Sequence, residues 1–234
     1  MKTLDDPRIV VGMRRQMADR RRLLDRGEVP LGWKLGCNPP AFMAKLAIEK
    51  PLTGSLLKSG LVPSGAEVPL KGWIKPVADP EIAVHLCKDV PGGADRATVV
   101  AAIGGLGPAI ELGDIQFMPD ADSVEAVLAA NIFQRHVILG VPDMTRGGNV
   151  DGLEVLALRN GVEVGRTSDP ERSIGNILDL VRHLADMLAA FGERLRAGEV
   201  IITGSPFPLI FVGPADSFVH RLDPLGEVSV RFTH

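Results

Sequence analysis

Two carboxylates stand two residues apart at the start of a predicted strand. Asp79 and Glu81 precede or begin the mostly apolar run that ends at Leu86. Side chains alternate between the two faces of a strand, so both carboxylates would point the same way. Two negative charges so close repel each other, and a cation held between them would relieve that repulsion. The pair therefore indicates either a cation site or two solvent-exposed acids.

A third carboxylate is isolated in an apolar segment. Glu111 is the one charged residue of the strand predicted over 108–112. A carboxylate buried in such a strand needs a partner, which would be either a metal shared with Asp79 and Glu81 or a salt bridge. Three carboxylates without a histidine form an oxygen site that suits Mg²⁺ or Mn²⁺ rather than Zn²⁺.

The remaining candidates are a lysine and a few histidines. Lys34 lies in an otherwise apolar strand predicted over 31–37, so it faces either a buried site or water at a sheet edge. His85 would share a strand face with Glu81, where a structural role is favoured. The sequence has no P-loop, GxGxxG, GxSxG, HExxH or CxxC motif. Its chemistry is therefore expected to depend on carboxylates and lysine.

These residues must be positioned by a fold rich in short strands. An N-terminal helix is predicted from the Asp6 cap to Gly27, and the longest helix over 174–191. Asn160 and Gly161 indicate a type I′ hairpin between 154–159 and 162–166. Shorter helices are predicted over 41–48, 97–103 and 123–130, and further strands over 54–57, 136–139, 200–203 and 228–232. Because no strand–helix–strand rhythm repeats, the sequence predicts an α+β fold with a mixed sheet folded on itself.

Composition excludes several classes of protein. The 234 residues carry a net charge of −3, which argues against general nucleic-acid binding. Two cysteines form no disulfide framework and suggest a reducing compartment. Residues 1–10 lack the apolar core of a secretory signal, and no uncharged stretch is long enough to span a membrane. We therefore expect a cytoplasmic protein with no nucleic-acid or membrane partner.

Six segments, in order, resemble the fumarylacetoacetate hydrolase superfamily, and within it the 2-keto-4-pentenoate hydratase and 4-oxalocrotonate decarboxylase branch. The matching segments span nearly the whole chain and include the lysine strand, the acid-x-acid strand and a glycine turn near the C-terminus. They are residues 32–36 (GWKLG), 50–54 (KPLTG), 79–83 (DPEIA), 108–114 (PAIELGD), 130–140 and 198–205 (GEVIITGS).

The resemblance implies a fold, a site and an oligomer. The fold would be a mixed sheet rolled into a barrel-like shape with a few flanking helices, in one domain whose catalytic part spans 31–234 behind a helical extension over 1–30. The site residues that it implies are the metal ligands Asp79, Glu81 and Glu111, the catalytic Lys34, the substrate-binding Asn131, Thr203, Gly204 and Ser205, and Asp114 as a residue that orients its neighbours. Members of the family are usually homo-oligomers, so we expect one here.

The implied reaction is metal-dependent hydration of a 2-hydroxydienoate to a 4-hydroxy-2-oxo acid, as in the catabolism of aromatic compounds by a lyase. Two departures bear on it. Leu52 stands where such hydratases often carry an acid, which fits a decarboxylase of the 4-oxalocrotonate type at least as well. The first histidine, His85, comes too late for the histidine–glutamate pair of the C–C hydrolases, which disfavours an acylpyruvate hydrolase. A non-catalytic relative is the remaining alternative. Asp79 replaces the usual glutamate and is one methylene shorter, so it would bind the ion directly or through water.

Overall fold

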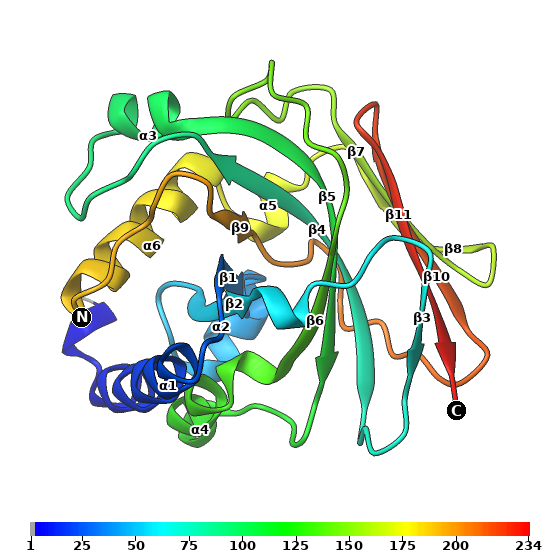
Figure 1. Cartoon of the computed structure of the whole chain (residues 1–234), viewed down its shortest axis with the longest axis horizontal. Coiled ribbons are helices and arrows are strands. Elements are labelled where there is room, and N and C mark those ends of the chain that lie inside the picture. The colour runs from blue at the N-terminus through cyan, green and yellow to red at the C-terminus, as the bar shows by residue number, and fades with distance from the viewer. Residues whose placement is uncertain (1–2) are drawn as a thin grey trace.

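The computed structural model describes residues 3–234 and places the candidate residues in a curved six-stranded sheet. The strand order is β2-β1-β9-β4-β5-β6, in which β1 and β9 run parallel and the other neighbours antiparallel. The bounds are β1 Pro30–Gly36, β2 Leu52–Leu57, β4 Pro76–Leu86, β5 Ile103–Asp114, β6 Gln134–Leu139 and β9 Val200–Ile202. Figure 1 shows β4 and β5 as the long strands that curve through the middle of the molecule.

A second, five-stranded sheet packs against β4 and β5, on the right of Figure 1. Its order is β3-β11-β10-β7-β8, with β3 and β11 parallel. The strands are β3 Ala66–Pro69, β7 Glu154–Arg159, β8 Val162–Thr167, β10 Ser217–Asp223 and β11 Gly226–Thr233. Buried side chains of the two sheets interleave, including Ile110 and Leu112 of the first sheet and Phe218 and Val230 of the second. The α+β class and the folded sheet predicted from the sequence are confirmed.

Helices cover the other side of the six-stranded sheet. They are α1 Pro7–Asp25, α2 Pro40–Leu46, α3 Arg96–Ala102, α4 Val124–Ala129, α5 Glu171–Ile174 and α6 Ile177–Ala190, with 3-10 turns at Thr3–Asp5, Lys58–Gly60, Ala121–Ser123 and Asn131–Phe133. As predicted, the Asp6 carboxylate caps α1 by accepting from the Arg8 amide. Within the described residues, no helix is long and apolar enough to cross a membrane.

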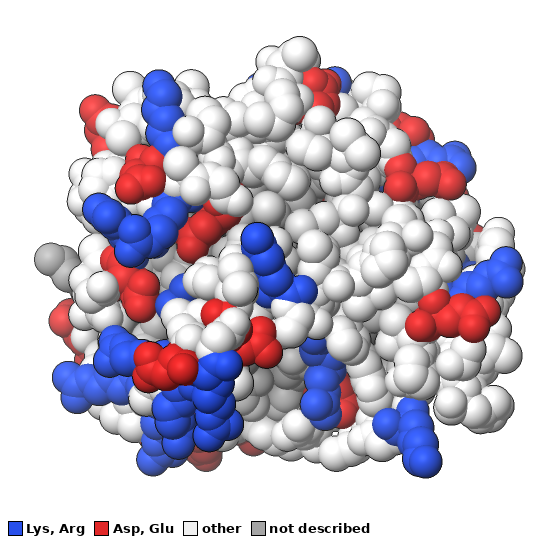
Figure 2. Space-filling view, viewed as in Figure 1, with Lys and Arg blue, Asp and Glu red and all other residues white. Residues whose placement is uncertain are grey.

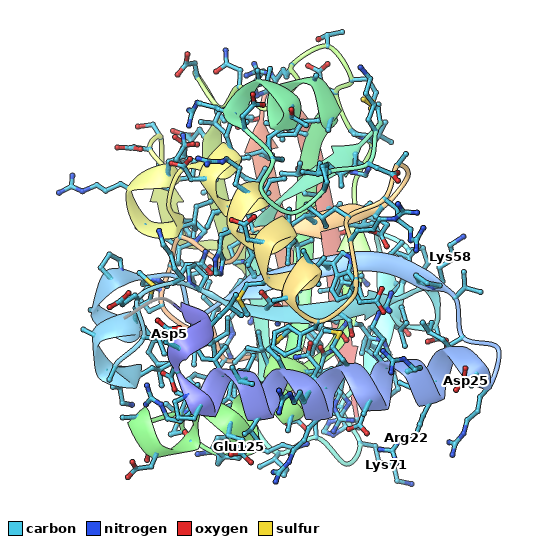
Figure 3. All side chains as sticks on the ribbon, turned by 90° about the vertical axis from the view of Figure 1, so that its left-hand side faces the viewer. Asp5, Arg22, Asp25, Lys58, Lys71 and Glu125 are labelled. Carbon is cyan, nitrogen blue, oxygen red and sulfur yellow. The ribbon has the colours of Figure 1, made fainter. Side chains whose placement is uncertain are left out.

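Helix α1 lies along the outside of the molecule, as Figure 3 shows between Asp5 and Asp25. Its buried residues Ile9 and Met13 join the core that also holds Trp33 of β1. The Gln16 amide donates to the carbonyls of Thr53 and Leu128, which fastens the helix to β2 and α4. On the face shown in Figure 2, charged side chains gather at the lower left, over α1 and α4, and uncharged residues cover much of the centre.

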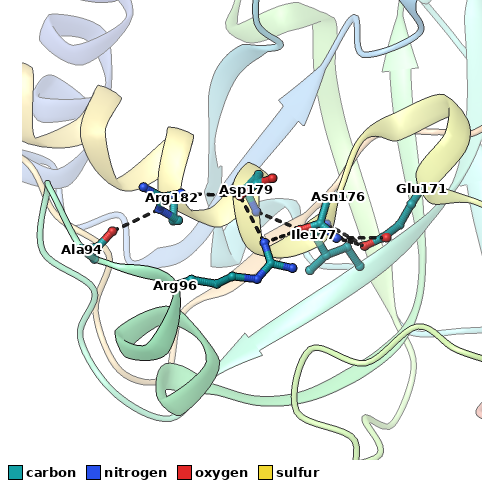
Figure 4. Close-up of polar contacts among 7 residues, drawn as sticks. All are labelled: Ala94, Arg96, Glu171, Asn176, Ile177, Asp179 and Arg182. Carbon is teal, nitrogen blue, oxygen red and sulfur yellow. Dashed lines mark hydrogen bonds and ion pairs between the residues drawn. The ribbon is translucent and has the colours of Figure 1, made fainter.

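The helix predicted over 174–191 corresponds to α6, which begins three residues later than predicted, at Ile177. The short helix α5 ends at Ile174 and is followed by Gly175, which has a φ of +96°; Asn176 then caps α6 by accepting from the Asp179 amide. Figure 4 shows how Arg96 of α3 reaches Asn176 and Asp179 across this junction.

Several strand predictions were too short or absent. Strand β4 begins at Pro76 rather than at residue 81, so Asp79 lies inside it. Proline has no amide hydrogen to donate to a neighbouring strand, and Pro80 is tolerated because β9 pairs with β4 only at residues 83–85. Strand β5 begins at Ile103, where a helix end was predicted. Strand β10 was missed because His220 and Arg221 obscure its alternation. The hairpin at Asn160 and Gly161 is confirmed, with φ of +54° and +75°.

Candidate active site

The sheet register brings the predicted chemical groups to one face of the sheet. Asp79 of β4 pairs directly with Glu111 of β5, and Glu81 lies two residues further along β4 on the same face. Strand β9 lies between β4 and β1. Its residue Ile202 pairs with Ala83 of β4 and with Lys34 of β1, so Lys34 lies on the same face of the sheet as the carboxylates. The curvature of the sheet then lets β1 and β5 face each other across β9 and β4.

Lys34 and Glu111 form a buried ion pair. The Lys34 ammonium contacts a Glu111 carboxylate oxygen, and the two residues are 2% and 5% exposed. The lysine side chain passes over Gly54 of β2, where a Cβ would lie 2.7 Å from the Lys34 Cγ. Lys34 therefore does not face water at a sheet edge, which was the alternative left open by its sequence, and glycine at position 54 makes room for it.

Glu81 is buried and held by the turn that follows β9. The Gly204 amide donates to the Glu81 Oε2 at 2.5 Å, and the Thr203 hydroxyl donates to the Ile82 carbonyl at 3.0 Å. Gly204 has a φ of +88°, and a Cβ there would lie 2.3 Å from the Asn38 Oδ1. Burial raises the pKa of Glu81 well above its usual value, and the Glu111 charge adds to the rise, against the effect of Lys34.

Asp79 carries a buried oxygen that no protein group satisfies. Its Oδ1 has no hydrogen-bond partner, although buried carboxylate oxygens are normally bonded. Burial, and next the charge of Glu111, raise the pKa of Asp79 to about 7. Within residues 3–234, no three acidic, histidine or cysteine side chains already stand in an arrangement that could hold a metal ion. The donor set nevertheless fits a hard cation, because it combines an unbonded carboxylate oxygen with two neighbouring carboxylates.

The four groups lie at one end of a cavity of about 720 Å³. Its other walls are mostly apolar and come from α2, the segment after β5, and the loop after β9. Four phenylalanines take part, namely Phe42, Phe133, Phe207 and Phe211. The sequence predicted the charged end, but the walls could not be assigned from it, because loop residues carry no periodic signal.

Of the other predicted site residues, some line the cavity and others lie outside it. Ser205 lines the cavity, whereas Thr203 is fully buried behind it. Asn131 does not line the cavity; its amide group exchanges two hydrogen bonds with the backbone of Ser55, at 2.7 and 2.9 Å. Asp114 also lies outside the lining. It accepts from the amides of Ile74 and Lys75 and from Arg135, and so fastens the end of β5 to the loop before β4.

Three residues near the site were not expected from the sequence. Cys37 lines the cavity with a φ of +64°, and burial raises the pKa of its thiol to about 12. The Asn38 amide donates to the carbonyls of Thr203 and Ile174 and so holds the turn beside Glu81. A ring nitrogen of His220 lies 3.0 Å from the Glu81 carbonyl. Asn38 could have been noticed in the sequence, because it is a polar residue directly after the strand that carries Lys34. No sequence pattern pointed to His220.

Both departures noted in the sequence can be located. Leu52 is 2% exposed, packs in the main core and does not line the cavity. No histidine appears among the described residues that line the cavity. Among the described lining residues there is thus no acid beyond Asp79, Glu81 and Glu111, and no histidine to activate water.

The fold and the site agree with a match to a known family. Residues 38–233 match the sequence model described as fumarylacetoacetate (FAA) hydrolase C-terminal. The chain belongs to this family. The match includes the acid-x-acid strand, Glu111 and the glycine turn, while Lys34 lies just before it.

Two curated relatives within the fumarylacetoacetate hydrolase family are 32% identical over 219 residues. One is a 4-oxalocrotonate decarboxylase of Pseudomonas putida, covering 91% of this chain and 81% of that protein. The other is a 2-keto-4-pentenoate hydratase of Burkholderia vietnamiensis, covering 88% and 79%. A solved 4-oxalocrotonate decarboxylase from Pseudomonas putida G7, complexed with magnesium and adipate, superposes with a TM-score of 0.84 at 31% identity, over 93% of this chain and 83% of that one. The branch is thus shared with both hydratases and decarboxylases.

Proposed function

We propose that this chain is a divalent-metal-dependent lyase that hydrates a small 2-hydroxydienoate to a 4-hydroxy-2-oxo acid. The observation that carries the proposal is the unbonded Asp79 Oδ1 beside Glu81 and Glu111, at the charged end of a cavity that also holds Lys34. Related chains named as hydratase support the reaction, and a related structure with magnesium supports the metal.

Asp79, Glu81 and Glu111 are the residues that would hold the ion, which we propose to be Mg²⁺ or Mn²⁺. The bound ion would polarise the 2-oxo group as a Lewis acid. Because Glu111 pairs with Lys34 and Glu81 with Gly204 in the structure, their carboxylates must turn toward Asp79 to share a cation. Asp79 reaches less far than a glutamate would and contributes either directly or through water.

Lys34 would bind and stabilise the reacting part of the substrate. Its ammonium lies at the charged end of the cavity and can donate to an oxygen on which enolate charge develops. The low-polarity surroundings strengthen such a hydrogen bond. The Ser205 hydroxyl lines the same cavity and can donate to the substrate carboxylate, since it otherwise only accepts from the Phe207 amide.

The other predicted substrate-binding residues would act by positioning. The Gly204 amide is engaged by Glu81, and Thr203 anchors the turn to β4. Asn131 fastens Ser55 of β2, one residue beyond the glycine that faces Lys34. Homo-oligomer formation, a cytoplasmic location and a place in aromatic catabolism stay predictions of the family resemblance.

Decarboxylation of a 4-oxalocrotonate-type acid is the second candidate. Leu52 favours it, because Leu52 packs in the core and the cavity offers no additional acid to protonate a carbon. Loss of CO₂ leaves its electron pair in the enolate and needs no added water. The solved decarboxylase that resembles this chain was complexed with adipate, itself a dicarboxylate.

Thermal melts with metal test the metal site, and turnover assays with three substrates test the reaction. Mg²⁺ or Mn²⁺ should raise the melting temperature of the wild type and of Glu227→Gln, an exposed control, but not of Glu81→Gln. An unchanged wild-type melt at millimolar metal would refute the metal site. Ultraviolet loss of 2-hydroxypenta-2,4-dienoate indicates hydration, and CO₂ release from 4-oxalocrotonate indicates decarboxylation. Turnover of neither, with cleavage of an acylpyruvate, would replace both by a hydrolase.

A further inference from the structure

Charge is distributed very unevenly along the cavity. Lys34 is the one lysine or arginine among the described lining residues, and it lies at the carboxylate end, against Glu111. The remaining wall is formed mainly by carbon. Phe42 and Phe133 belong to it, and Phe207, Leu209 and Phe211 follow one another along the loop after β9.

The cavity is also larger than the reacting head of a 2-oxo acid requires. Its volume of about 720 Å³ falls within the range of roughly 300–1,000 Å³ of sites that enclose drug-sized ligands. The walls do not close over the outer part completely, since Met118 and Phe211 line it while 47% and 43% exposed. The outer part is therefore room for a substrate tail.

We infer that this site takes 2-oxo acids, or their dienol forms, that carry a bulky uncharged alkyl or aryl tail, and that it discriminates against acids with a second, distal carboxylate. The inference rests on the proposed hydratase function, because the charged residues must hold the 2-oxo acid head for its tail to lie along the apolar wall, and it counts against the second candidate, whose substrate carries a distal carboxylate. It is carried by the absence of a second cation from the described lining, together with the size of the cavity.

The physical reason is the difference in what the two tails would contact. A hydrocarbon tail leaves water and packs on phenylalanine rings, which gains about a fourfold increase in affinity for each methylene buried. A distal carboxylate against these rings would lose part of its hydration without meeting a cation among the described lining residues. The Lys45 ammonium lies 5.9 Å from the Phe42 ring centroid, but Lys45 is exposed and does not line the cavity.

A pair of ligands of equal shape tests the inference by binding rather than by turnover. The diacid 2-oxoadipate and its uncharged isostere 6-methyl-2-oxoheptanoate differ only in a terminal carboxylate against an isopropyl group. Isothermal titration calorimetry in the presence of Mg²⁺ should give the wild type a dissociation constant at least tenfold lower for the isostere. Equal affinities, or tighter binding of the diacid, would overturn the inference.

Variants of the wall sharpen the test. Met118→Arg places a cation on the apolar wall at an exposed position that tolerates it, and should reduce or reverse the preference for the isostere. Phe211→Arg should do the same and serves if Met118→Arg does not fold. Met144→Arg, at a methionine that is 57% exposed and does not line the cavity, is the matched control and should keep the wild-type ratio. A shift of equal size in the control would contradict the assignment of the wall.

Oxalate separates the failure of this inference from that of the proposed function. Oxalate presents the chelating head with no tail, and in the presence of Mg²⁺ it should bind wild type and Met118→Arg alike. Oxalate binding without a preference between the two longer acids would overturn only the tail specificity. No binding of oxalate, with or without Mg²⁺, would overturn the proposed head site and the inference with it. Lys45→Ala should leave the preference unchanged, because Lys45 lies outside the cavity.

Discussion

The two ends of the cavity are built from different parts of the chain. At the charged end, Lys34, Asp79, Glu81 and Glu111 project from three strands of one sheet, and the register fixes which of them face each other. At the apolar end the wall comes largely from segments between strands, such as the loop that carries Phe207 and Phe211. Strands hold ionisable groups in fixed geometry, whereas loops vary at little cost to the fold. We therefore expect the sheet to determine the chemistry and the loops to determine which substrate is accepted.

The largest expected effect comes from breaking the ion pair at the charged end. Glu111→Leu leaves the buried Lys34 ammonium without the carboxylate that it contacts, so urea denaturation of the metal-free protein should show a loss of about 3–5 kcal/mol in the free energy of unfolding. Metal-dependent activity should be lost as well, because a proposed ligand is gone.

The double variant Lys34→Met/Glu111→Leu provides the control for that loss. It removes both charges and should recover most of the stability, since apolar residues of similar volume often replace a buried pair without cost. Activity should stay absent. A double variant as unstable as Glu111→Leu would mean that the cost arises from packing, and the charged end would then not differ from the rest of the core.

The sequence predicted the charged end better than the apolar end, for a physical reason. The two-residue period of a strand places Asp79 and Glu81 on one face whatever surrounds them. The α+β class followed from a sequence rich in turn residues that shows no repeating strand–helix–strand order. The partner of each carboxylate depends on pairing between strands far apart in the chain. A sequence pattern cannot decide whether Glu111 meets Asp79, Lys34 or water.

What the sequence missed depends on context outside each segment. Asn131 matched a family segment, yet its side chain bonds the Ser55 backbone away from the cavity. His220 lies in a strand whose alternation was obscured, and it reaches Glu81 only because the second sheet packs on the first. The metal ligands, the catalytic lysine and the division at residues 30 and 31 stay predictions.

The next largest effect tests how the turn after β9 supports the charged end. Gly204→Ala would place a Cβ 2.3 Å from the Asn38 Oδ1 and disturb the amide that donates to Glu81. We expect the free energy of unfolding to fall by about 2 kcal/mol or more, and the stabilisation by metal to be lost. Strain at a positive φ alone accounts for about 1–2 kcal/mol.

Gly198→Ala isolates that strain from the contact. Gly198 has nearly the same φ, +85°, but no atom lies within 4 Å of a Cβ there. The Gly198→Ala variant should lose only about 1–2 kcal/mol of its free energy of unfolding and should still be stabilised by metal. If the two variants behave alike in melts with and without Mg²⁺, the Asn38 and Glu81 contacts do not support the site.

A smaller effect is expected at the apolar end. Phe211→Ala shortens the wall at a residue that is 43% exposed, so the free energy of unfolding should change little. Affinity for a 2-oxo acid with a bulky apolar tail should fall about tenfold, whereas affinity for oxalate should not change. Calorimetry with both ligands measures this, and equal losses for both would show that the wall and the head are not separate.

The smallest effect concerns Asp114, which lies three residues beyond Glu111 but outside the cavity. Although burial acts to raise the pKa of Asp114, the amides of Lys75 and Ile74 and the Arg135 guanidinium together hold it below its usual value. The folded state therefore binds this proton less readily than the unfolded chain. The resulting stability is fully present above the unfolded pKa of about 4 and is lost as the pH falls through the lower folded pKa.

Asp114→Asn tests this acid-sensitive contact. The amide keeps an oxygen for the two backbone donors but loses the charge that faces Arg135, a half-exposed partner, so neutral stability should fall by only about 0.5 kcal/mol. Below pH 4 the difference between variant and wild type should shrink, because the wild-type carboxylate becomes protonated. Urea midpoints measured from pH 7 to pH 2 give the comparison. Because Asp114 does not line the cavity, binding of oxalate with Mg²⁺ at pH 7 should match the wild type, and a large loss would mean that the end of β5 positions Glu111.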